Sequence, residues 1–413
     1  MRVLLGTHTV DPTQGGEGGT GWGWAESLAR NPAIERVEVV AHPQAREAIE
    51  QRLTDDSALA TKLHFHWVLP PKLIDPWKGS PPGKKVWHRL LLHYQLWQLA
   101  AERAARPLVK RLDVAHHVTL GSIYLRTFVT ELPLPYIIGP VGGGQAASTR
   151  DALMLLKKTR DVHSAFELVR SLLIRPMGRR SVVRRRLSGA SAVLCANSQT
   201  LQLARRYQPR SELMIDGGID SLPTRRAGPP GAAPIVLWVG KLEARKDPLA
   251  ALDVAEALRT MMPAARLLIA GTGWLSDRMS REIARRSLSG TVDLAGHIPF
   301  EHMDATYASA SVFLFTSLRD TFGVQNLEAM TYGLPIVFRD SSGVSVSDFA
   351  GPAAIPVANR DGWATKAALA ITELLQNPRS WQARSDAAIT AAQGFTWAAK
   401  AERAVTLYEQ SLR

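Results

Sequence analysis

Strand-like and helix-like segments alternate along almost the whole chain, and this alternation limits the fold more than any other feature of the sequence. Parallel strands need long crossover connections, which are usually helices, so the pattern predicts α/β domains with helices on both faces of parallel sheets. Buried strands are expected at residues 3–7, 37–41, 114–118, 136–139 and 192–196, and then at 235–239, 266–270, 292–295, 312–315, 336–338 and 354–357.

The chain has 413 residues, which is the length of two ordinary domains. Residues 223–234 contain Gly228, Pro229, Pro230 and Gly231, a composition typical of an exposed linker. We therefore predict an N-terminal domain over 1–222 and a C-terminal domain over 235–395, each a doubly wound parallel sheet. Ligands of such sheets bind beyond the carboxyl ends of the strands, so the active site is expected in the cleft between two facing domains.

Charge and cysteine content restrict the compartment and the partners. The single Cys195 excludes an internal disulfide, which fits a reducing compartment and predicts a cytoplasmic location. The first residues lack the apolar core of a signal peptide, and no apolar stretch reaches the roughly 18 residues of a membrane span. The net charge is +13, and residues 1–220 hold 30 basic against 19 acidic side chains. An anionic partner is therefore expected for the first half.

Two basic segments carry much of this excess. Residues 67–111 combine prolines and tryptophans with bases such as Lys72, Lys84 and Lys85, and residues 170–186 hold seven arginines among leucine and valine side chains, including Arg179 and Arg180. Trp, Leu and Arg in this mixture can lie in an anionic bilayer interface. The alternative is an ordinary surface helix with a solvated basic face.

The motif SLRDTFGVQNLEAMTYGLP at 317–335 follows a predicted strand, passes through a turn at Gly323 and opens a helix near Val324. The free amides of Val324 and Gln325 at such a helix start could hold a phosphate. Glu328 follows one turn later, where its carboxylate can accept hydrogen bonds from sugar hydroxyls. In the alternative interpretation, Asp320 caps the helix and Glu328 complements its dipole.

Further motifs stand at other predicted strand ends of the second half. Gly240, Lys241 and Lys246 follow the first strand, and the two lysines could neutralise a diphosphate, although they also fit a solvated basic loop. Gly271 follows the second strand and permits close approach of backbone to a ligand. His297 follows the third strand, where an ordinary half-buried histidine is the alternative.

The succession G-K-L-E-x-R-K-D, L-x-I-A-G-x-G, L-x-G-H-I and S-L-R-D-T-F-G-x-x-x-L-E-A-M-x-x-G-L-P closely resembles the nucleotide-sugar half of glycosyltransferase family 4, the retaining enzymes of GT-B fold. The first half is similar more loosely, through a glycine loop at 18–21, a D-x-x-H-H strand at 113–117 and a G-P-V-G-G-G turn at 139–144. Phe-Thr-Trp at 395–397 resembles the start of the family's C-terminal helix, so residues 396–413 are expected to pack back on the N-terminal domain.

The resemblance implies transfer of a sugar from a nucleotide diphosphate sugar to an acceptor, with retained anomeric configuration and no required metal or other cofactor. Glu328 would bind the donor ribose, and Lys241 and Lys246 would neutralise the departing diphosphate. Asp320 stands at the family's sugar-facing acidic position. The remaining donor-binding positions are Gly240, Gly271, His297, Ile298, Gly323, Val324 and Gln325.

In the N-terminal domain the resemblance implies an acceptor or phosphate loop at Gly18, Gly19, Thr20 and Gly143. It also implies a catalytic histidine that contacts the transferred sugar, at His116 or His117. Neighbouring residues of a strand point to opposite faces, so only one of these two histidines can face the cleft.

The expected partners are a nucleotide-sugar donor and a glycan or lipid-linked acceptor of cell-surface polysaccharide synthesis, with peripheral contact to an anionic membrane at the inner face of the plasma membrane. A nucleotide-sugar epimerase or phosphorylase on the same scaffold is the alternative enzyme. The basic half contains no nucleic-acid recognition motif, so no nucleic acid is expected. Gly16, Gly18 and Gly21 fit G-x-G-x-x-G, but they begin nine residues after the first strand, which argues against a nicotinamide site.

Overall fold

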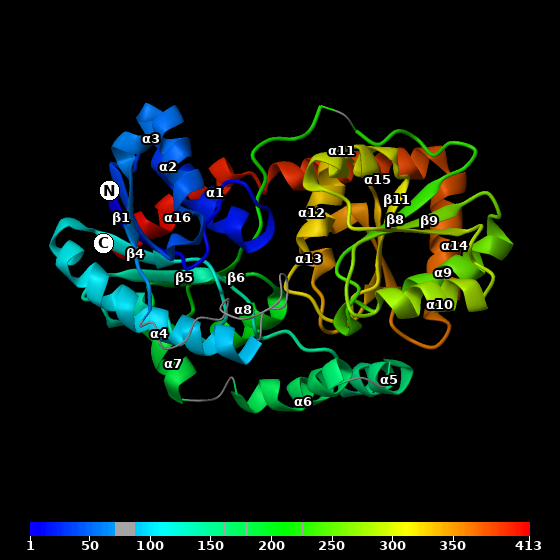
Figure 1. The fold of residues 1–413 in the computed structure, drawn as a ribbon, viewed down its shortest axis with the longest axis horizontal. Coiled ribbons are helices and arrows are strands. Elements are labelled where there is room, and N and C mark those ends of the chain that lie inside the picture. Colours follow the sequence, from blue (N-terminus) through cyan, green and yellow to red (C-terminus); the bar gives the residue numbers. More distant parts are fainter. Residues whose placement is uncertain (71–86, 160–161, 178–180, 225) are drawn as a thin grey trace. The chain divides into compact units, whose positions relative to one another are not determined.

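The computed structural model describes residues 1–70, 87–159, 162–177, 181–224 and 226–413 (Figure 1). The chain forms two compact units. The first comprises Met1–Gly144, Met177–Asp220 and Thr396–Arg413, and the second comprises Gln145–Pro176 and Ser221–Phe395. Each unit is an α/β domain built on a parallel sheet.

The sheet of the first unit has seven parallel strands in the order β3-β2-β1-β4-β5-β6-β7. In chain order they are β1 Arg2–Gly6, β2 Arg36–Ala41, β3 Leu63–Trp67, β4 Val114–His117, β5 Tyr136–Val141, β6 Ala192–Cys195 and β7 Ser211–Leu213. The α-helices assigned to this unit are α1 Gly16–Arg30, α2 Arg46–Asp55, α3 Ser57–Lys62, α4 Trp87–Ala105, α7 Ser181–Ser188, α8 Ser198–Ala204 and α16 Trp397–Ser411. Its 3-10 turns are η1 Pro43–Ala45, η2 Arg106–Arg111 and η3 Phe128–Glu131.

Alternating side chains of these strands build two cores on opposite faces of the sheet. Val3 and Leu5 of β1 pack into a core shared with α1 and α16, whereas Leu4 packs into a core shared with α4 and α7. Successive side chains of a strand point to opposite faces, so a continuous apolar strand supplies both cores. The helices on both faces explain why central strands such as β1 and β6 are apolar on both sides.

The sheet of the second unit has six parallel strands in the order β10-β9-β8-β11-β12-β13. They are β8 Ile235–Val239, β9 Arg266–Ala270, β10 Val292–Gly296, β11 Val312–Phe315, β12 Ile336–Asp340 and β13 Ala354–Ala358. The α-helices are α5 Thr149–Thr159, α6 Val162–Met177, α9 Pro248–Met261, α10 Ser276–Arg285, α11 Phe300–Ser309, α12 Val324–Thr331, α13 Val346–Ala350, α14 Trp363–Gln376 and α15 Pro378–Gln393. Its 3-10 turns are η4 Ala244–Lys246 and η5 Gly351–Ala353.

Side-chain caps fix the starts of several helices. The side-chain oxygens of Asn197, Asn377 and Thr396 each accept a hydrogen bond from the backbone N–H three residues later, at the starts of α8, α15 and α16. Such a cap satisfies one of the amides that a helix leaves without an intrahelical partner.

All eleven strands expected from the sequence are confirmed, and so is the doubly wound architecture of each unit. Two strands were missed, β3 and β7, and both lie at the edges of the first sheet. Strand β3 reads LHFHW, in which His64 and His66 interrupt the apolar run, and β7 has three residues of which one is Glu212. An edge strand has one neighbour to pair with and is less buried, so its sequence carries a weaker apolar signal.

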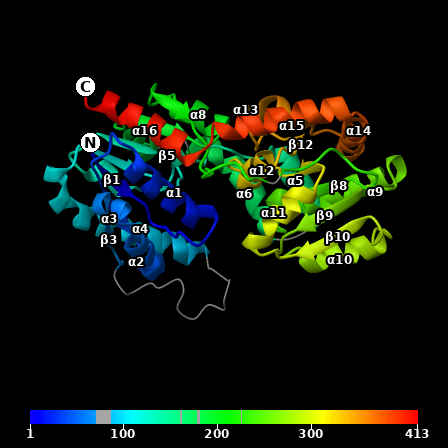
Figure 2. The ribbon, with the colours of Figure 1, turned by 90° about the horizontal axis from the view of Figure 1, so that it is seen from above.

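The division into units differs from the predicted domain boundaries in one segment. Residues Gln145–Pro176, which the sequence placed within 1–222, group with the second unit. Helix α16 lies beside α1 in the first unit, as the red and dark-blue helices of Figure 1 and Figure 2 show. Its residues Ala401, Ala404 and Tyr408 belong to the core of that unit.

Part of the predicted bilayer-contacting sequence, including Lys72, Lys84, Lys85, Arg179 and Arg180, lies outside the described residues. Among the residues that are described, no helix combines the length and the apolar character needed to cross a membrane.

We predict that Gly271→Ala destabilises the second unit by at least about 2 kcal/mol, because its backbone φ is +142° and an added Cβ would lie 1.8 Å from the carbonyl oxygen of Gly240. Chemical unfolding of the purified protein measures the change. Gly290→Ala is the matched control, since a Cβ there would meet nothing within 4 Å. Equal stability of the two variants would contradict the packing of these two loops.

Candidate functional site

The candidate site lies where the strand order of the second sheet reverses. Strands β8 and β11 are neighbours there, with β9 following on one side and β12 on the other. The connections that leave such a pair run to opposite faces of the sheet and open a crevice beyond the carboxyl ends. Lys246 lies in the loop after β8 and Asp320 in the loop after β11.

A buried ion pair joins these two loops. The Nζ of Lys246 lies 2.8 Å from Oδ2 of Asp320, and Nη1 of Arg245 lies 3.2 Å from the other carboxylate oxygen. Lys246 and Asp320 are both buried. Burial alone would raise the pKa of Asp320, but the charges of Lys246 and Arg245 outweigh burial and hold this pKa well below its usual range. Asp320 is therefore ionised, and Lys246 is already paired before any ligand binds.

Hydrogen bonds to backbone atoms hold both loops in place. The hydroxyl of Thr316 donates to the carbonyl oxygen of Lys246 over 2.7 Å and accepts from the indole N–H of Trp238 over 2.9 Å. The backbone N–H of Leu318 donates to the carbonyl oxygen of Arg245. Buried polar groups that are fully paired in this way rigidify the segment that carries them.

Helix α12 begins at Val324, as the sequence predicted, after Gly323 with a backbone φ of +81°. No side chain caps this helix, so the alternative in which Asp320 is its cap is wrong. The first amides of α12, at Val324 and Gln325, point out of the helix start, where an anion is favoured. Within the described part of the chain, the buried Nε2 of Gln325 has no hydrogen-bond partner.

Glu328 lies one turn into α12 and is half-buried. Its carboxylate accepts a hydrogen bond of 2.5 Å from the hydroxyl of Tyr307 on α11, and the Tyr307 ring stacks on Tyr332 at 5.3 Å. Burial raises the pKa of Glu328, and the hydrogen bond from Tyr307 and the charge of Lys246 oppose this rise only in part. Tyr307 was missed from the sequence, where nothing marks it as the partner of a residue 21 positions later.

The remaining predicted donor positions surround this carboxyl edge. The backbone N–H of Gly240 bonds to Ala270, and that of Gly271 bonds to Gly296, so the ends of β8, β9 and β10 are tied together. Lys241 and His297 are exposed and Ile298 is half-buried. Lys241 is therefore exposed whereas Lys246 is buried, although the sequence assigned the same role to both lysines.

The two histidines of the first unit are both buried, on opposite faces of the sheet. Burial lowers the pKa of His116 to about 4 and that of His117 to about 3, so both rings are neutral at neutral pH. His116 donates from Nε2 to the carbonyl oxygen of Gly139 over 2.7 Å and accepts at Nδ1 from the Tyr408 hydroxyl over 2.6 Å. His117 contacts the hydroxyl of Tyr94 on α4. The opposite orientations are as expected, and both histidines fill packing positions inside the unit.

The predicted glycine loop of the first unit is a helix. Gly18, Gly19 and Thr20 lie in the first turns of α1, and the Thr20 hydroxyl donates to the carbonyl oxygen of Gly16. A Cβ at Gly19 would lie 2.5 Å from the backbone oxygen of Gln14, so this glycine allows the preceding loop to fold against the helix. Gly143 follows β5 at the carboxyl edge, with a φ of +116°.

Helices α5 and α6 contact the same two loops, although the sequence assigned no donor-site role to either segment. Lys158 of α5 lies 3.2 Å from Oδ1 of Asp247, the residue after Lys246. Glu167 of α6 accepts two hydrogen bonds, of 2.7 and 2.6 Å, from Arg319, the residue before Asp320. Both ends of the Lys246–Asp320 pair are therefore tied to segment 145–176.

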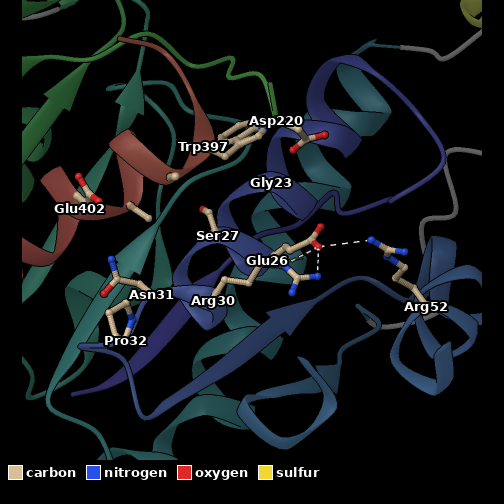
Figure 3. Close-up of a pocket in the computed structure, with 12 residues that line it drawn as sticks. Gly23, Glu26, Ser27, Arg30, Asn31, Pro32, Arg52, Asp220, Trp397 and Glu402 are labelled. Carbon is tan, nitrogen blue, oxygen red and sulfur yellow. Dashed lines mark hydrogen bonds and ion pairs between the residues drawn. The ribbon is translucent and has the colours of Figure 1, made fainter. Parts of the chain in front are cut away.

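A cavity of about 580 Å³ lies between α1 and α16 in the first unit (Figure 3). Figure 3 shows Glu26 paired with Arg30 and Arg52, and Trp397 lining the cavity from α16. None of the predicted site residues lines it. Asn31 and Pro32, which do, precede β2 and so lie toward the amino ends of the strands, away from the edge at which doubly wound sheets bind ligands. No group of three or more metal-ligating side chains is found within the described residues.

Known proteins are similar to the chain in fold over its whole length and in sequence over part of it. Sucrose-phosphate synthase from Thermosynechococcus elongatus superposes with a TM-score of 0.63 at 17% identity, over 99% of this chain and 98% of that one. Anabaena HepE, solved in complex with UDP and glucose, superposes with a TM-score of 0.56 at 13% identity, over 99% and 98% of the two chains. The fold is GT-B. Identity this low shows the fold alone.

Sequence similarity is concentrated in the second unit of this GT-B chain. Residues 224–391 match the family model described as glycosyl transferases group 1. The O-antigen chain mannosyltransferase B of Escherichia coli is 29% identical over 164 residues, which are 39% of this chain and 42% of that protein. The chain spans less than half the length of the curated relatives it matches first. Residues 224–391, which match the family model, contain β8 to β13 and the Lys246–Asp320 pair.

We predict that Asp320→Asn lowers the unfolding free energy at neutral pH by about 3 kcal/mol, because it leaves Lys246 buried without its anion. The folded-state pKa of Asp320 is depressed, so its contribution is present above the unfolded pKa of about 4 and is lost as the pH falls toward the folded pKa. Denaturant titrations from pH 3 to 7 should therefore show the difference from wild type shrinking in acid.

Asp361→Asn is the control for this series, because Asp361 pairs with Arg150 at an almost fully exposed position. Exposed ion pairs contribute little, so its effect should stay below about 0.5 kcal/mol at every pH. A pH-independent loss in Asp320→Asn would show that the ionised carboxylate is not what stabilises the two loops.

Proposed function

We propose that this protein is a retaining glycosyltransferase, which transfers a sugar from a nucleotide diphosphate sugar to a glycan or lipid-linked acceptor in cell-surface polysaccharide synthesis. The observation that carries the proposal is the meeting of Lys246, Asp320 and the uncapped start of α12 at the switch point of the second sheet. This arrangement lies in the segment that matches the glycosyl transferases group 1 model. HepE, with the same fold, was solved with UDP and glucose.

Each donor group has a counterpart at this edge. The diphosphate lies at the amides of Val324 and Gln325, where the helix dipole favours negative charge. Lys241 and Lys246 stabilise the charge that develops on the leaving diphosphate when the bond to the sugar breaks. Glu328 accepts hydrogen bonds from the ribose hydroxyls, and the backbone at His297 and Ile298 borders the base.

The burial and ion pairing of Lys246 explain how its role differs from that of Lys241. Its ammonium is buried against Asp320, with the Phe315 ring 5.9 Å away, so it is a fixed charge that needs no rearrangement as the diphosphate leaves. Lys241 is exposed and must be ordered by the ligand. With two lysines and a helix start supplying positive charge, we propose that no metal ion is needed. The first unit would bind the acceptor, and peripheral contact with an anionic membrane would bring a lipid-linked acceptor within reach.

Calorimetric titration with a panel of nucleotide diphosphates and their sugars tests the donor site. At least one should bind, and Glu328→Gln should weaken it by about tenfold or more, since a hydrogen bond to a charged acceptor contributes about 1.5 to 3 kcal/mol. Glu373→Gln, at an exposed position on α14, is the matched control and should bind as wild type does. Absence of binding to every member of the panel by folded wild-type protein would refute the donor site.

A second experiment should distinguish the roles of Lys241 and Lys246. Lys241→Ala should weaken binding of the preferred nucleotide diphosphate by about tenfold while leaving thermal stability unchanged, because its side chain is exposed. Lys246→Met should weaken binding and also destabilise the fold, because it leaves Asp320 buried with Arg245 as its remaining cation. Calorimetry and thermal unfolding of the same samples distinguish these outcomes. If both variants lost affinity and stability alike, the assignment of separate roles would be wrong.

Product analysis separates glycosyl transfer from the other reactions that this fold could support. Incubation with the bound donor and a lipid-linked acceptor should yield a glycosylated acceptor, and chromatography with NMR of the product should show retained anomeric configuration. Free epimerised nucleotide sugar or sugar phosphate, formed without any acceptor product, would instead identify an epimerase or a phosphorylase.

A further inference from the structure

Tyr307 holds the carboxylate that the proposed function assigns to the donor ribose. Its side chain is buried on α11, and its hydroxyl donates a hydrogen bond of 2.5 Å to Oε2 of Glu328 on α12. The other carboxylate oxygen, Oε1, has no hydrogen-bond partner within the described residues, and solvent reaches it. The hydrogen bond from Tyr307 therefore occupies one oxygen of Glu328 and leaves the other for a ligand.

Neighbouring aromatic rings fix the direction of the Tyr307 hydroxyl. The Tyr307 ring stacks on Tyr332 with 5.3 Å between centroids and 12° between planes, and the ring of Phe313 on β11 lies 6.4 Å away. Burial and the charge of Glu328 raise the pKa of Tyr307 well above its usual value, so the hydroxyl keeps its proton. Tyr307 is thus a hydrogen-bond donor with a fixed position.

This donor affects both the conformation and the ionisation of Glu328. A glutamate side chain that is ordered only when a ligand binds loses rotamer freedom at that moment, and ordering it beforehand removes this cost. The titratable groups that interact with the carboxylate are Tyr307, Lys246 from the loop after β8, and Tyr332 after α12. Burial raises the pKa of Glu328, whereas the hydrogen bond from Tyr307 and the charge of Lys246 lower it and so favour the ionised form.

We propose that Tyr307 is a positioning residue of the donor site, which holds Oε2 of Glu328 so that Oε1 accepts hydrogen bonds from the ribose hydroxyls. This inference rests on the proposed function and adds a residue to its donor site. Helix α11, which carries Tyr307, begins two residues after Ile298, whose backbone borders the base in that proposal. The same helix therefore places the base and the ribose carboxylate relative to each other.

The second tyrosine of the stack provides a matched control. The hydroxyl of Tyr332 donates a hydrogen bond to the carboxylate of Asp304, an exposed residue of α11, and not to Glu328. Tyr307→Phe and Tyr332→Phe each remove one hydroxyl and keep both stacked rings. Only Tyr307→Phe removes the hydrogen bond to Glu328, so a difference between the two variants reports that hydrogen bond and not the packing of the rings.

Calorimetric titration of the full chain with uridine, guanosine and adenosine diphosphates at pH 7.5 and pH 5.5 tests this role. For the diphosphate that wild type binds most tightly, Tyr307→Phe should weaken binding about fivefold at pH 7.5. The loss relative to wild type should be larger at pH 5.5, because a carboxylate without this hydrogen bond takes up its proton at a higher pH. Tyr332→Phe should keep the pH profile of wild type, and thermal unfolding should show that both variants fold.

A double-mutant cycle shows whether Tyr307 acts through Glu328. In a Glu328→Ala background, Tyr307→Phe should weaken binding by less than about twofold, because the carboxylate that it positions is absent. Equal losses in the two backgrounds, or wild-type affinity of Tyr307→Phe at both pH values, would overturn the role of Tyr307 and leave the donor site standing. If folded wild-type protein bound none of the three diphosphates, the donor site itself would be refuted, and the role of Tyr307 with it.

Discussion

The carboxylate of Asp320 lies between Lys246 and Arg245 at the point where the second sheet changes direction, and the candidate site depends on this contact. It joins the loop after β8 to the loop after β11, so two segments 74 residues apart keep a fixed geometry. A buried charge is tolerated only when it is paired and hydrogen-bonded, and here both lysine and carboxylate meet that condition. The same pairing that stabilises the fold fixes the position of the Lys246 ammonium at this edge.

Charge pairing extends outward from this contact in a connected set. Asp247 follows Lys246 directly, is buried, and pairs with Lys158 and with Arg339 at 2.8 Å. Burial alone would raise the pKa of Asp247, but Lys158 and Arg339 together lower it. Arg339 also lies over the ring of Trp363. Strand β12, helix α14 and segment 145–176 are thus connected to the loop of Lys246 through the side chains of Asp247, Lys158 and Arg339.

The sequence predicted correctly the elements that a local pattern of residues determines. It predicted less well the segments whose conformation depends on contacts with residues distant in the chain. The strand at 235–239 and the helix start at Val324 were predicted correctly, because apolar runs and a glycine turn mark them locally. The glycines at 18 and 19 indicated a loop, yet residues from Gly16 onward form a helix, since packing against the preceding loop overrides glycine's low helix propensity. The adjacent histidines at 116 and 117 lie on opposite faces of the sheet, as the alternation of a strand predicts, and both are buried.

Helix α6 shows the same limit in a different form. An amphipathic pattern identifies two faces but does not say which of them is buried, and the usual assumption is that the apolar one is. In this helix Arg319 favours the inward orientation of Glu167, because its guanidinium donates two hydrogen bonds to that carboxylate. The apolar side chains of Phe166 and Leu172 are exposed instead. Arg319 is 152 residues away in the chain and belongs to the same loop as Asp320. The residue that orients the outward apolar face is therefore a neighbour of the ion pair on which the candidate site depends, and both follow from one requirement, that no buried charge is left without a partner.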